Sequence, residues 1–303
     1  MASAYTPGLR VAPHTVVRKT RRLPVPGEVL VKVGDQVTAD QVVARTHLPG
    51  KVLPINVANH LSILPDELEA AMRKQVGEPI KEGDLLAETR SFFGLFREEA
   101  RSPIDGFVES ISAVTGLVIL RGTPDPVEVR ADLDGVVVEE MPEEGVVVET
   151  SGAHVQGIFG LAGEVSGSIA VVAQRPEDVV EPAHIRPEHK GRILVGGSRL
   201  TLPAFARAVD LGVAGIVCGG FEYHDLHALL GRELGVAVTG GEALGTTLMV
   251  TEGFGKIAMA AATHELLVAC EGRHASMTGA TQIRAGVIRP EIVIPGKLSL
   301  IHI

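Results

Sequence analysis

The stretch Pro26–Ala44, PGEVLVKVGDQVTADQVVA, alternates apolar and polar residues, breaks at Gly34-Asp35 and then alternates again. Period-two alternation is typical of half-buried strands, and Gly-Asp between two such runs supplies the positive φ that a chain reversal needs. A shorter copy, IKEGDLLA, follows at Ile80–Ala87. The two copies predict β-hairpins that are built in the same way.

Further turn and strand signals surround these copies. Ser102–Ile111 predicts a turn that feeds a strand, and Asp134-Gly135-Val136-Val137 repeats this pattern. Short strands with Gly at each corner, over about residues 23–172, predict a β-sandwich or barrel of similar halves. One short amphipathic helix is expected within residues 64–75, with Asp66 as its N-cap.

Two segments of the first half allow two interpretations each. Residues 1–22 predict either a solvated lead-in strand or a surface for an anionic partner. Their cationic residues are Arg10, Arg18, Lys19, Arg21 and Arg22. The insert Phe92–Phe96 is rich in phenylalanine, which predicts either packing across a barrel mouth or an exposed docking loop.

The pattern Val31-x-Val33-Gly34-Asp35-x-Val37, followed by Gln41–Ala44 and later by Ser102-Pro103-x-Asp105-Gly106-x-Val108, resembles the barrel-sandwich hybrid fold. Biotinyl and lipoyl carrier domains share this fold, as do the N-terminal domains of the RnfC and NqrA subunits of ion-translocating redox complexes. The resemblance covers roughly a third of the chain and implies a fold rather than an activity.

Two features of those families are missing from this sequence. Carrier domains present a modified lysine within Met-Lys-Met or Asp-Lys-Ala, and neither Lys51 nor Lys81 has such neighbours. The cluster-binding cysteines and the flavin-site glycine pattern of RnfC are absent as well. We therefore expect neither covalent biotin or lipoate nor electron transfer.

The second half alternates continuous apolar runs with helical patterns. The apolar runs are Gly191–Gly197, Ala214–Gly220, Val236–Gly241 and Thr247–Gly255, and the helical segments are residues 202–211, 224–234 and 257–269. This alternation predicts βαβ units around a mainly parallel sheet that is buried on both faces. The expected fold class is multidomain α and β: an all-β barrel-sandwich hybrid followed by a three-layer, Rossmann-like α/β domain.

These patterns predict six segments. They are a barrel-sandwich hybrid with a helical insert (1–125), a β-rich extension of it (126–173), a linker (174–190), a Rossmann-like domain (191–285), the start of a truncated β-module (286–297) and an adapter-derived tail (298–303). The linker is predicted from its prolines and charges. The tail, LSLIHI, matches a translated transposon mosaic end, so we expect the natural protein to continue differently after about Pro295.

In open parallel sheets, ligands bind beyond the carboxyl ends of the strands. The Gly-rich strand ends therefore predict an anion or nucleotide site, because Gly lets backbone N–H groups approach a ligand. The predicted lining is Gly197, Gly220, Gly241, Gly253 and Gly255. The structural alternative is that these glycines only turn tight corners. No Gly-x-Gly-x-x-Gly opens the first unit, and Gly241–Thr247 lacks the P-loop lysine.

Other polar residues near the same edge suggest catalysis or metal binding, each with a structural alternative. Cys218 would be a nucleophile with His224 as its base, or it is a small buried cysteine. Tyr223–His227 would need Glu252 as a further metal ligand, or its histidines are surface residues at a helix start. We expect the second alternative in each case, and no metal site.

The polar segment Glu271–Arg284 follows a predicted buried helix and has the composition of a loop. Loops over a rigid sheet often carry function. Arg273 and Arg284 would clamp an anion there, or they would pair with the carboxylates that the chain has in excess.

Composition argues against several classes of function. The net charge is −9 with no basic block, and aromatic residues are only 3%, so nucleic-acid binding lacks both its electrostatic and its stacking signature. Two cysteines are too few for a disulfide framework or an iron–sulfur cluster. No leader pattern and no apolar run of about 18–20 residues occurs, so we expect a cytoplasmic protein without a membrane span.

The sequence thus predicts a non-catalytic scaffold or adaptor subunit that works with protein partners or as a homo-oligomer. The alternative is an enzyme or sensor that binds an anionic small molecule or nucleotide at the Gly-Gly edge. A third hypothesis is a carrier domain with a modified lysine. Ligand-dependent thermal stabilisation separates the first two, because binding to the native state raises stability by mass action.

Overall fold

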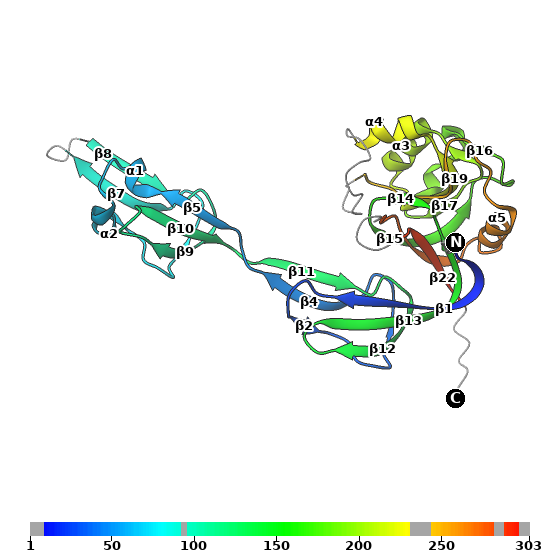
Figure 1. Cartoon of the computed structure of the whole chain (residues 1–303), viewed down its shortest axis with the longest axis horizontal. Coiled ribbons are helices and arrows are strands. Elements are labelled where there is room, and N and C mark those ends of the chain that lie inside the picture. Colours follow the sequence, from blue (N-terminus) through cyan, green and yellow to red (C-terminus); the bar gives the residue numbers. More distant parts are fainter. Residues whose placement is uncertain (1–8, 92–95, 231–243, 282–287, 297–303) are drawn as a thin grey trace, which may run out of the picture. The chain divides into compact units, whose positions relative to one another are not determined.

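The structure is a computed structural model of the 303-residue chain. It describes residues 9–91, 96–230, 244–281 and 288–296, apart from a few side chains beside these gaps. Strands predominate over helices in the described residues (Figure 1). Contacts divide the chain into unit 1 (Met1–Arg22, Glu28–Ala44 and Val129–Ile303) and unit 2 (Leu23–Gly27 and Arg45–Glu128). The segment 1–125, predicted as one domain, contributes to both units.

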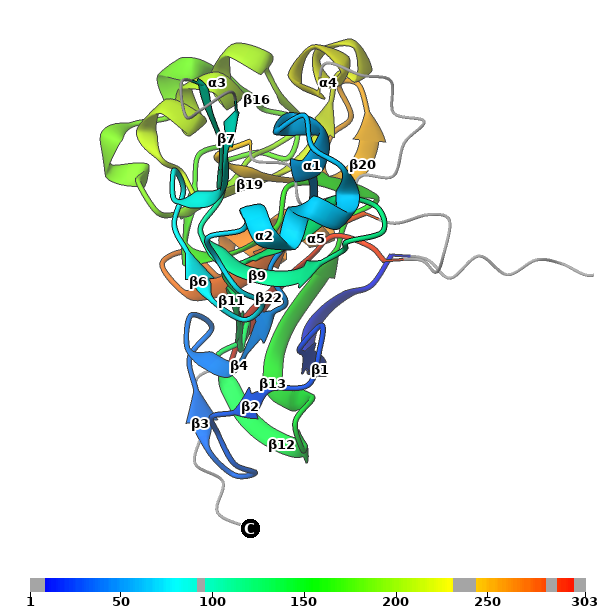
Figure 2. The ribbon, with the colours of Figure 1, turned by 90° about the vertical axis from the view of Figure 1, so that its left-hand side faces the viewer.

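Unit 1 contains a large mixed sheet whose antiparallel part is organised around one long strand. β13 (Gly145–Gln156) pairs antiparallel with β1 (Val11–Arg22), as Figures 1 and 2 show. It also pairs with β12 (Gly135–Met141) and with β22 (Glu291–Pro295). Polar and apolar residues alternate along β1, so Val17 faces a core of valines while Val16 faces solvent.

Several shorter strands complete this part. In the large sheet they are β3 (Gln36–Val37), β14 (Phe159–Leu161) and β21 (His274–Thr278). A separate three-stranded sheet has the order β11 (Asp125–Arg130), β4 (Val42–Leu48) and β2 (Glu28–Val29), and β4 and β11 each contain residues of both units. β22 pairs with β13 on one side and with β21 on the other. The prediction that residues 286–297 open a third module is therefore wrong for the described part of that range. The tail 298–303 lies outside the described residues.

The predicted parallel strands are present in unit 1. Their order is β15 (Glu164–Val171), β17 (Ile193–Val195), β19 (Gly215–Phe221) and β20 (Thr247–Phe254). The helices are α3 (Leu202–Leu211), α4 (Tyr223–Leu230) and α5 (Ala261–Val268). These elements confirm the predicted alternation of strands and helices. The expected run at 236–241 lies outside the described residues.

Both faces of the parallel strands are covered, because consecutive residues are apolar. Ile216 of β19 packs in a cluster with Phe205 of α3. Its neighbour Val217 packs in a second cluster with Leu267 of α5. Adjacent residues of one strand point to opposite faces, so the continuous apolar run needs a cover on each side.

The segment predicted as a linker, residues 174–190, packs into unit 1. Its elements are β16 (Val179–Val180), which pairs with β18 (Arg199–Leu200), and the 3-10 helices η2 (Pro182–His184) and η3 (Pro187–His189). Val180 and Ile185 are fully buried. The linker prediction is wrong because two of the prolines begin helical turns, where a missing N–H costs nothing.

Unit 2 contains a four-stranded antiparallel sheet in the order β5-β10-β9-β6 and the separate pair β7-β8. The strands are β5 (Val52–Asn56), β6 (Pro79–Ile80), β7 (Leu85–Ser91), β8 (Phe96–Arg101), β9 (Gly106–Ile111) and β10 (Leu117–Gly122). The short helices are α1 (Val57–His60), η1 (Pro65–Glu67) and α2 (Leu68–Ala71). Their shared core includes the fully buried Leu68, Leu86 and Val118.

The helix predicted over residues 64–75 is shorter than expected and begins as a 3-10 turn. Leu64 is the N-cap residue of this turn, and its N–H donates to the Glu67 carboxylate at 3.0 Å. Asp66 lies in the first turn and is not the cap. Residues 92–95 of the Phe-rich insert lie outside the described residues, so neither interpretation of that insert is tested.

The two Gly-Asp turns have the same geometry. In Lys32–Asp35 of unit 1, the first residue donates its N–H to the carboxylate of the fourth at 2.8 Å, and the fourth donates its N–H back to the first carbonyl at 3.1 Å. Lys81–Asp84 of unit 2 repeats both bonds at 3.0 Å. Gly34 and Gly83 have φ values of 96° and 88°, which L side chains rarely adopt.

Two cationic residues of β1 form ion pairs within unit 1. Lys19 Nζ lies 2.6 Å from an Asp132 oxygen and 3.2 Å from a Glu291 oxygen. Arg21 binds both carboxylate oxygens of Glu164, at 2.6 and 2.7 Å. These two cations are therefore neutralised and do not form a free surface for an anionic partner.

Candidate functional site at the carboxyl edge of the parallel strands

The carboxyl ends of β17, β19 and β20 lie along one edge of the sheet, where the predicted ligand-binding glycines are found. Gly220 of β19 pairs with Gly253 of β20. Gly197 follows β17, and Gly255 follows β20. Gly241 lies outside the described residues. The structure thus places four of the five glycines at the expected edge.

Backbone from neighbouring loops occupies the space beside the Gly-Gly pairs. A Cβ atom on Gly197 would lie against the carbonyls of Arg175 and Asp178, and one on Gly220 would lie against the carbonyl of Gly255. Glycine at these positions lets two loops cross the sheet edge at close range. This geometry favours the structural alternative, and ligand binding by these glycines stays a prediction.

Gly253 and Gly255 are glycines for another reason. Their φ values are 141° and 104°, and a Cβ on Gly255 would meet no atom within 4 Å. The backbone conformation requires glycine here, whereas the space beside Gly255 is open.

Cys218 lies in the middle of the core and not in an open site. It is fully buried, and its thiol donates to the Gly220 carbonyl at 3.4 Å. Burial raises the pKa of the Cys218 thiol to about 12, which keeps it protonated and unreactive at neutral pH. His224 is exposed in the first turn of α4, and no hydrogen bond joins the two side chains.

Glu252 stabilises the start of α5 through hydrogen bonds. Its carboxylate accepts the Ala260 N–H at 2.9 Å and the Thr251 hydroxyl at 3.3 Å. Ala260 is the N-cap residue of α5 and has no side-chain acceptor of its own, so Glu252 caps the helix from β20. Among the described residues, no three His, Cys, Asp or Glu side chains come close enough together to hold a metal ion.

Arg273 lies at the other end of the strands. Its guanidinium donates to the Pro295 carbonyl, and its own carbonyl accepts the N–H of Ile169 at the amino end of the parallel segment. Among the described residues, the guanidinium of Arg273 is bonded to this carbonyl and to the Cys270 sulfur, and to no carboxylate. Arg284 lies outside the described residues, so the predicted pair of arginines is not tested.

An aromatic cluster at the carboxyl edge was not foreseen from the sequence. The Phe254 ring lies 5.3 Å from the Phe159 ring and 5.6 Å from the Tyr223 ring, measured between centroids. Tyr223 is 50% exposed and Phe254 43%, whereas Phe159, which packs against Phe254, is buried. We call these three residues the edge cluster. The available signal was an aromatic residue at the end of one buried strand, Phe254, and another two residues after the next, Tyr223.

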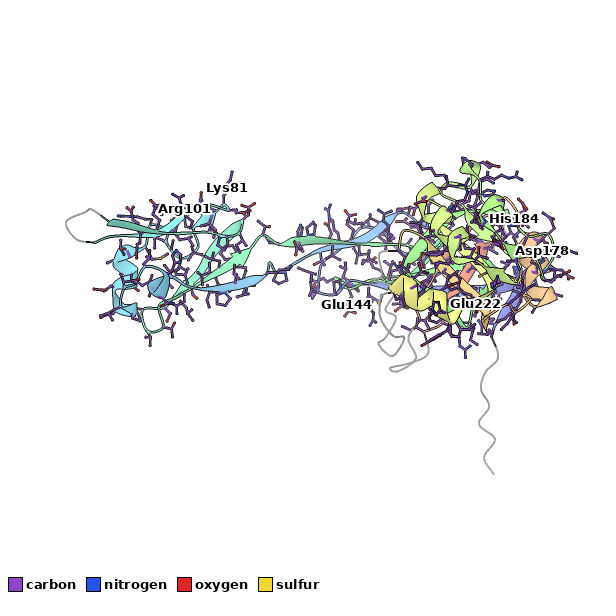
Figure 3. The ribbon with its side chains drawn as sticks, turned by 90° about the horizontal axis from the view of Figure 1, so that it is seen from above. Lys81, Arg101, Glu144, Asp178, His184 and Glu222 are labelled. Atoms are coloured by element: carbon purple, nitrogen blue, oxygen red, sulfur yellow. The ribbon has the colours of Figure 1, made fainter. Side chains whose placement is uncertain are left out.

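A charged pair lies near the edge cluster. Arg199 of β18 pairs in register with Gly220, and its Nη1 lies 3.0 Å from an oxygen of Glu222, which Figure 3 labels. Its Nε is buried and finds no hydrogen-bond acceptor within the described part of the chain. An anion would supply the acceptor that this unused N–H donor lacks.

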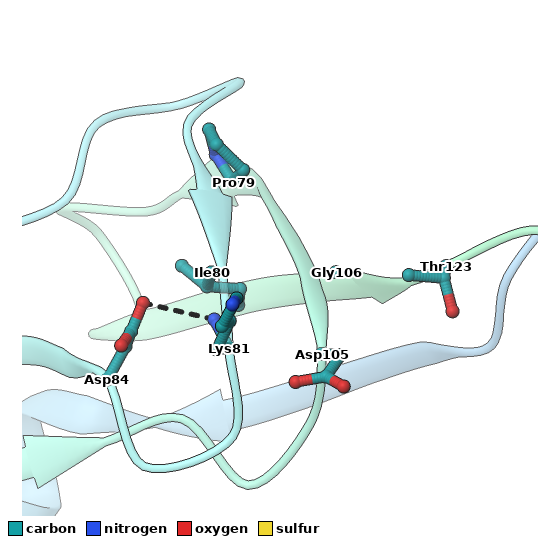
Figure 4. Close-up of a pocket in the computed structure, with 7 residues that line it drawn as sticks. All are labelled: Pro79, Ile80, Lys81, Asp84, Asp105, Gly106 and Thr123. Atoms are coloured by element: carbon teal, nitrogen blue, oxygen red, sulfur yellow. Dashed lines mark hydrogen bonds between the residues drawn. The ribbon is translucent and has the colours of Figure 1, made fainter.

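Unit 2 carries a surface hollow of about 450 Å³ (Figure 4). It is lined by Pro79, Ile80, Lys81, Asp84, Asp105, Gly106 and Thr123. The sequence motifs around Ile80 and Asp105 predicted turns and strands but no hollow, because its residues come from three segments of the chain that only the fold brings together.

Comparisons with protein-family models, with curated proteins and with solved structures find no match for this chain. None of the helices in the described residues combines the length and apolar character needed to cross a membrane. The site must therefore be interpreted from its own geometry.

Proposed function

We propose that this chain is a non-catalytic scaffold or adaptor subunit that binds a protein partner through the edge cluster. The observation that carries the proposal is the half-exposed aromatic surface of Tyr223 and Phe254, in which Phe254 packs on the buried Phe159. Exposed aromatic side chains supported from beneath are the residues that dominate the binding energy of protein interfaces.

The former catalytic candidates support the same proposal. Cys218 is buried with a raised pKa, and Glu252 caps a helix. Both groups serve the fold, so the edge has hydrophobic surface available for contact rather than an assembled set of reactive side chains.

We further propose that the β-rich parts are barrel-sandwich hybrids and that the parallel part is Rossmann-like. The repeated Gly-Asp turns support the first proposal, and the cover of α3 on one face and α5 on the other supports the second. The cytoplasmic location, and the expected absence of nucleic-acid, biotin, lipoate and metal partners, stay predictions.

Affinity purification of the tagged chain from its native host tests the adaptor role. Recovery of specific partner proteins with the variant Tyr223→Ser/Phe254→Ser should fall by about thirtyfold, since two hot-spot aromatics together contribute about 2 kcal/mol. Val114→Ser is the matched control, because Val114 is 89% exposed and lies in unit 2. Equal recovery with all three proteins would contradict the proposal.

A second function has two observations in its favour. The unsatisfied Nε of Arg199 and the open space at Gly255 fit a small anion or nucleotide at the same edge. A thermal-shift screen with inorganic phosphate and nucleotides tests it, with Arg199→Gln as the control variant. A shift of several degrees that this variant removes would favour the sensor or enzyme. If no ligand raises the melting temperature, the adaptor proposal is the one that remains.

A further inference from the structure

A second hollow adjoins the one in Figure 4 and extends it across the surface of unit 2. The two share Asp105 and Thr123, and the second has a volume of about 370 Å³. It adds Lys51, Glu82, Pro103, Ile104, Gly122 and Asp125 to the lining. We call the two hollows together the groove.

The groove has an apolar floor and a charged rim. Ile80 is 3% exposed at its base, whereas Asp105 and Thr123 are exposed above it. Its lining holds four carboxylates and two ammonium groups, so negative charge is in excess. Because the hollow is open along its length, it suits a ligand that lies across the surface more than one that is enclosed.

The rim carboxylates are available to a ligand. One Asp105 oxygen accepts the Glu82 N–H at 2.8 Å, which holds the side chain in place and leaves its second oxygen without a bonded partner in the described residues. The exposed Asp125 carboxylate forms no hydrogen bond or ion pair within the described residues. Lys81, at the surface of unit 2 in Figure 3, likewise forms no ion pair through its side chain within the described chain.

Main-chain pairing is not the way in which a ligand would bind here. The strand that borders the groove, β6, begins with Pro79, which has no N–H. The Pro79 carbonyl accepts Lys74 Nζ at 3.4 Å, and the main chain at Lys81 is bonded within the Gly-Asp turn. At Pro79 and Lys81, recognition would therefore use side chains.

We propose that the groove binds an extended segment of a partner protein that carries an apolar side chain next to a lysine or arginine. The apolar side chain lies over Ile80, and the cationic group faces Asp105 and Asp125. Charge complementarity favours this occupant over an acidic segment, because the carboxylates outnumber the lysines. The inference shares with the proposed function the idea of a protein partner but uses other residues. Its test is therefore independent of the edge cluster.

Selection from a phage-displayed library of random octapeptides against the full chain tests the proposal. Enriched peptides should combine Leu, Ile, Val or Phe with a neighbouring Lys or Arg. Their affinity should fall about fivefold in Asp105→Asn/Asp125→Asn, since partly exposed charges contribute up to about 1 kcal/mol together. Asn keeps an acceptor for the Glu82 N–H, so the variant should retain its fold.

Asp66→Asn is the matched control, because Asp66 is an exposed carboxylate elsewhere in unit 2. Its peptide affinity should equal that of the wild type, and binding to both proteins should weaken between low and high salt. Enrichment of acidic peptides, enrichment that the double variant does not reduce, or no enrichment at all would each overturn the proposal. Loss of binding in Tyr223→Ser/Phe254→Ser instead would assign the peptides to the edge cluster.

Discussion

Gly220 at the edge of the parallel strands and Gly34 in the hairpin turn of unit 1 are the same residue type used for opposite reasons. A Cβ on Gly220 would lie against the Gly255 carbonyl, whereas a Cβ on Gly34 would meet no atom within 4 Å. Gly34 instead has a φ of 96°. Space requires the first glycine and backbone conformation requires the second. Glycines at strand ends are therefore not by themselves evidence for a ligand site.

The largest effect expected from this comparison is that of Gly220→Ala. The added methyl group would displace backbone atoms of the 255–259 loop, and we expect a loss of about 3 kcal/mol, at the upper end for overpacking. Hydrogen exchange in β19 and β20, followed by mass spectrometry, measures the local opening free energy. A cost no larger than that of Gly34→Ala would show that the edge has room for a ligand.

Charged side chains stabilise part of the antiparallel region, and the dependence of stability on pH should show their contribution. Burial alone would raise the pKa of Glu291, but the hydrogen bond with His154 and the charge of Lys19 lower it to about 2. Because the folded-state pKa of Glu291 lies below the ordinary value of 4.5, the ionised carboxylate stabilises the fold above pH 4.5. This stabilisation is lost as the pH falls toward 2. In Glu291→Gln, the pH-dependent part of the free energy of unfolding should be smaller by about 3 kcal/mol.

Denaturant titrations of both proteins between pH 2 and pH 6 measure this difference. Asp132 contributes with the opposite sign, because burial raises its pKa despite the charge of Lys19. Lys19 contacts both carboxylates, so the difference between the wild type and Glu291→Gln measures Glu291 together with its coupling to Asp132. Parallel pH profiles would contradict the assignment.

Gly34→Ala and Gly83→Ala should have smaller and nearly equal effects. Each places an L side chain in a left-handed conformation, which costs about 1–2 kcal/mol, and no neighbouring atom adds to that cost. Hydrogen exchange in each turn measures the loss in its own unit. A difference greater than about 1 kcal/mol would show that the two turns are not equivalent.

Asp35→Ala and Asp84→Ala should have the smallest effects. Each removes one side-chain acceptor from a turn, at a cost of about 1 kcal/mol. Asp84 also lies 3.7 Å from Lys74 Nζ, so its replacement should cost slightly more. The Asn variants keep the acceptor and serve as controls, and Asp84→Asn should lose only the small ion-pair contribution.

Much of the secondary structure of the parallel region could be predicted from the sequence. The helix predicted over residues 202–211 is α3, and the runs around Val195, Val217 and Val250 are strands. These elements have strong local signals, namely continuous apolar runs and the 3.6-residue period. The linker prediction for residues 174–190 is wrong because a flexible linker and a packed pair of 3-10 turns can have the same content of prolines and charged residues.

The candidate site was predictable only in its location. The rule for parallel sheets placed Gly220 and Gly253 at the correct edge, but chain order does not show that the loop after β20 returns across Gly220. Likewise, Cys218 is adjacent in sequence to the edge glycines, yet its side chain faces the α3 layer. Which face a residue takes within a fully apolar strand has no signal in the sequence.

The sequence by itself determined the Gly-Asp turns, the amphipathic and apolar periods, and the residues that could carry chemistry, because these depend on neighbours within a few positions. Only the tertiary structure decided that residues 23–27 and 45–128 form one unit, that β22 inserts between β13 and β21, and which atoms surround each glycine. Those features depend on long-range pairing, in which chain segments far apart in sequence compete for the same neighbours. The edge cluster and the groove are of this second kind.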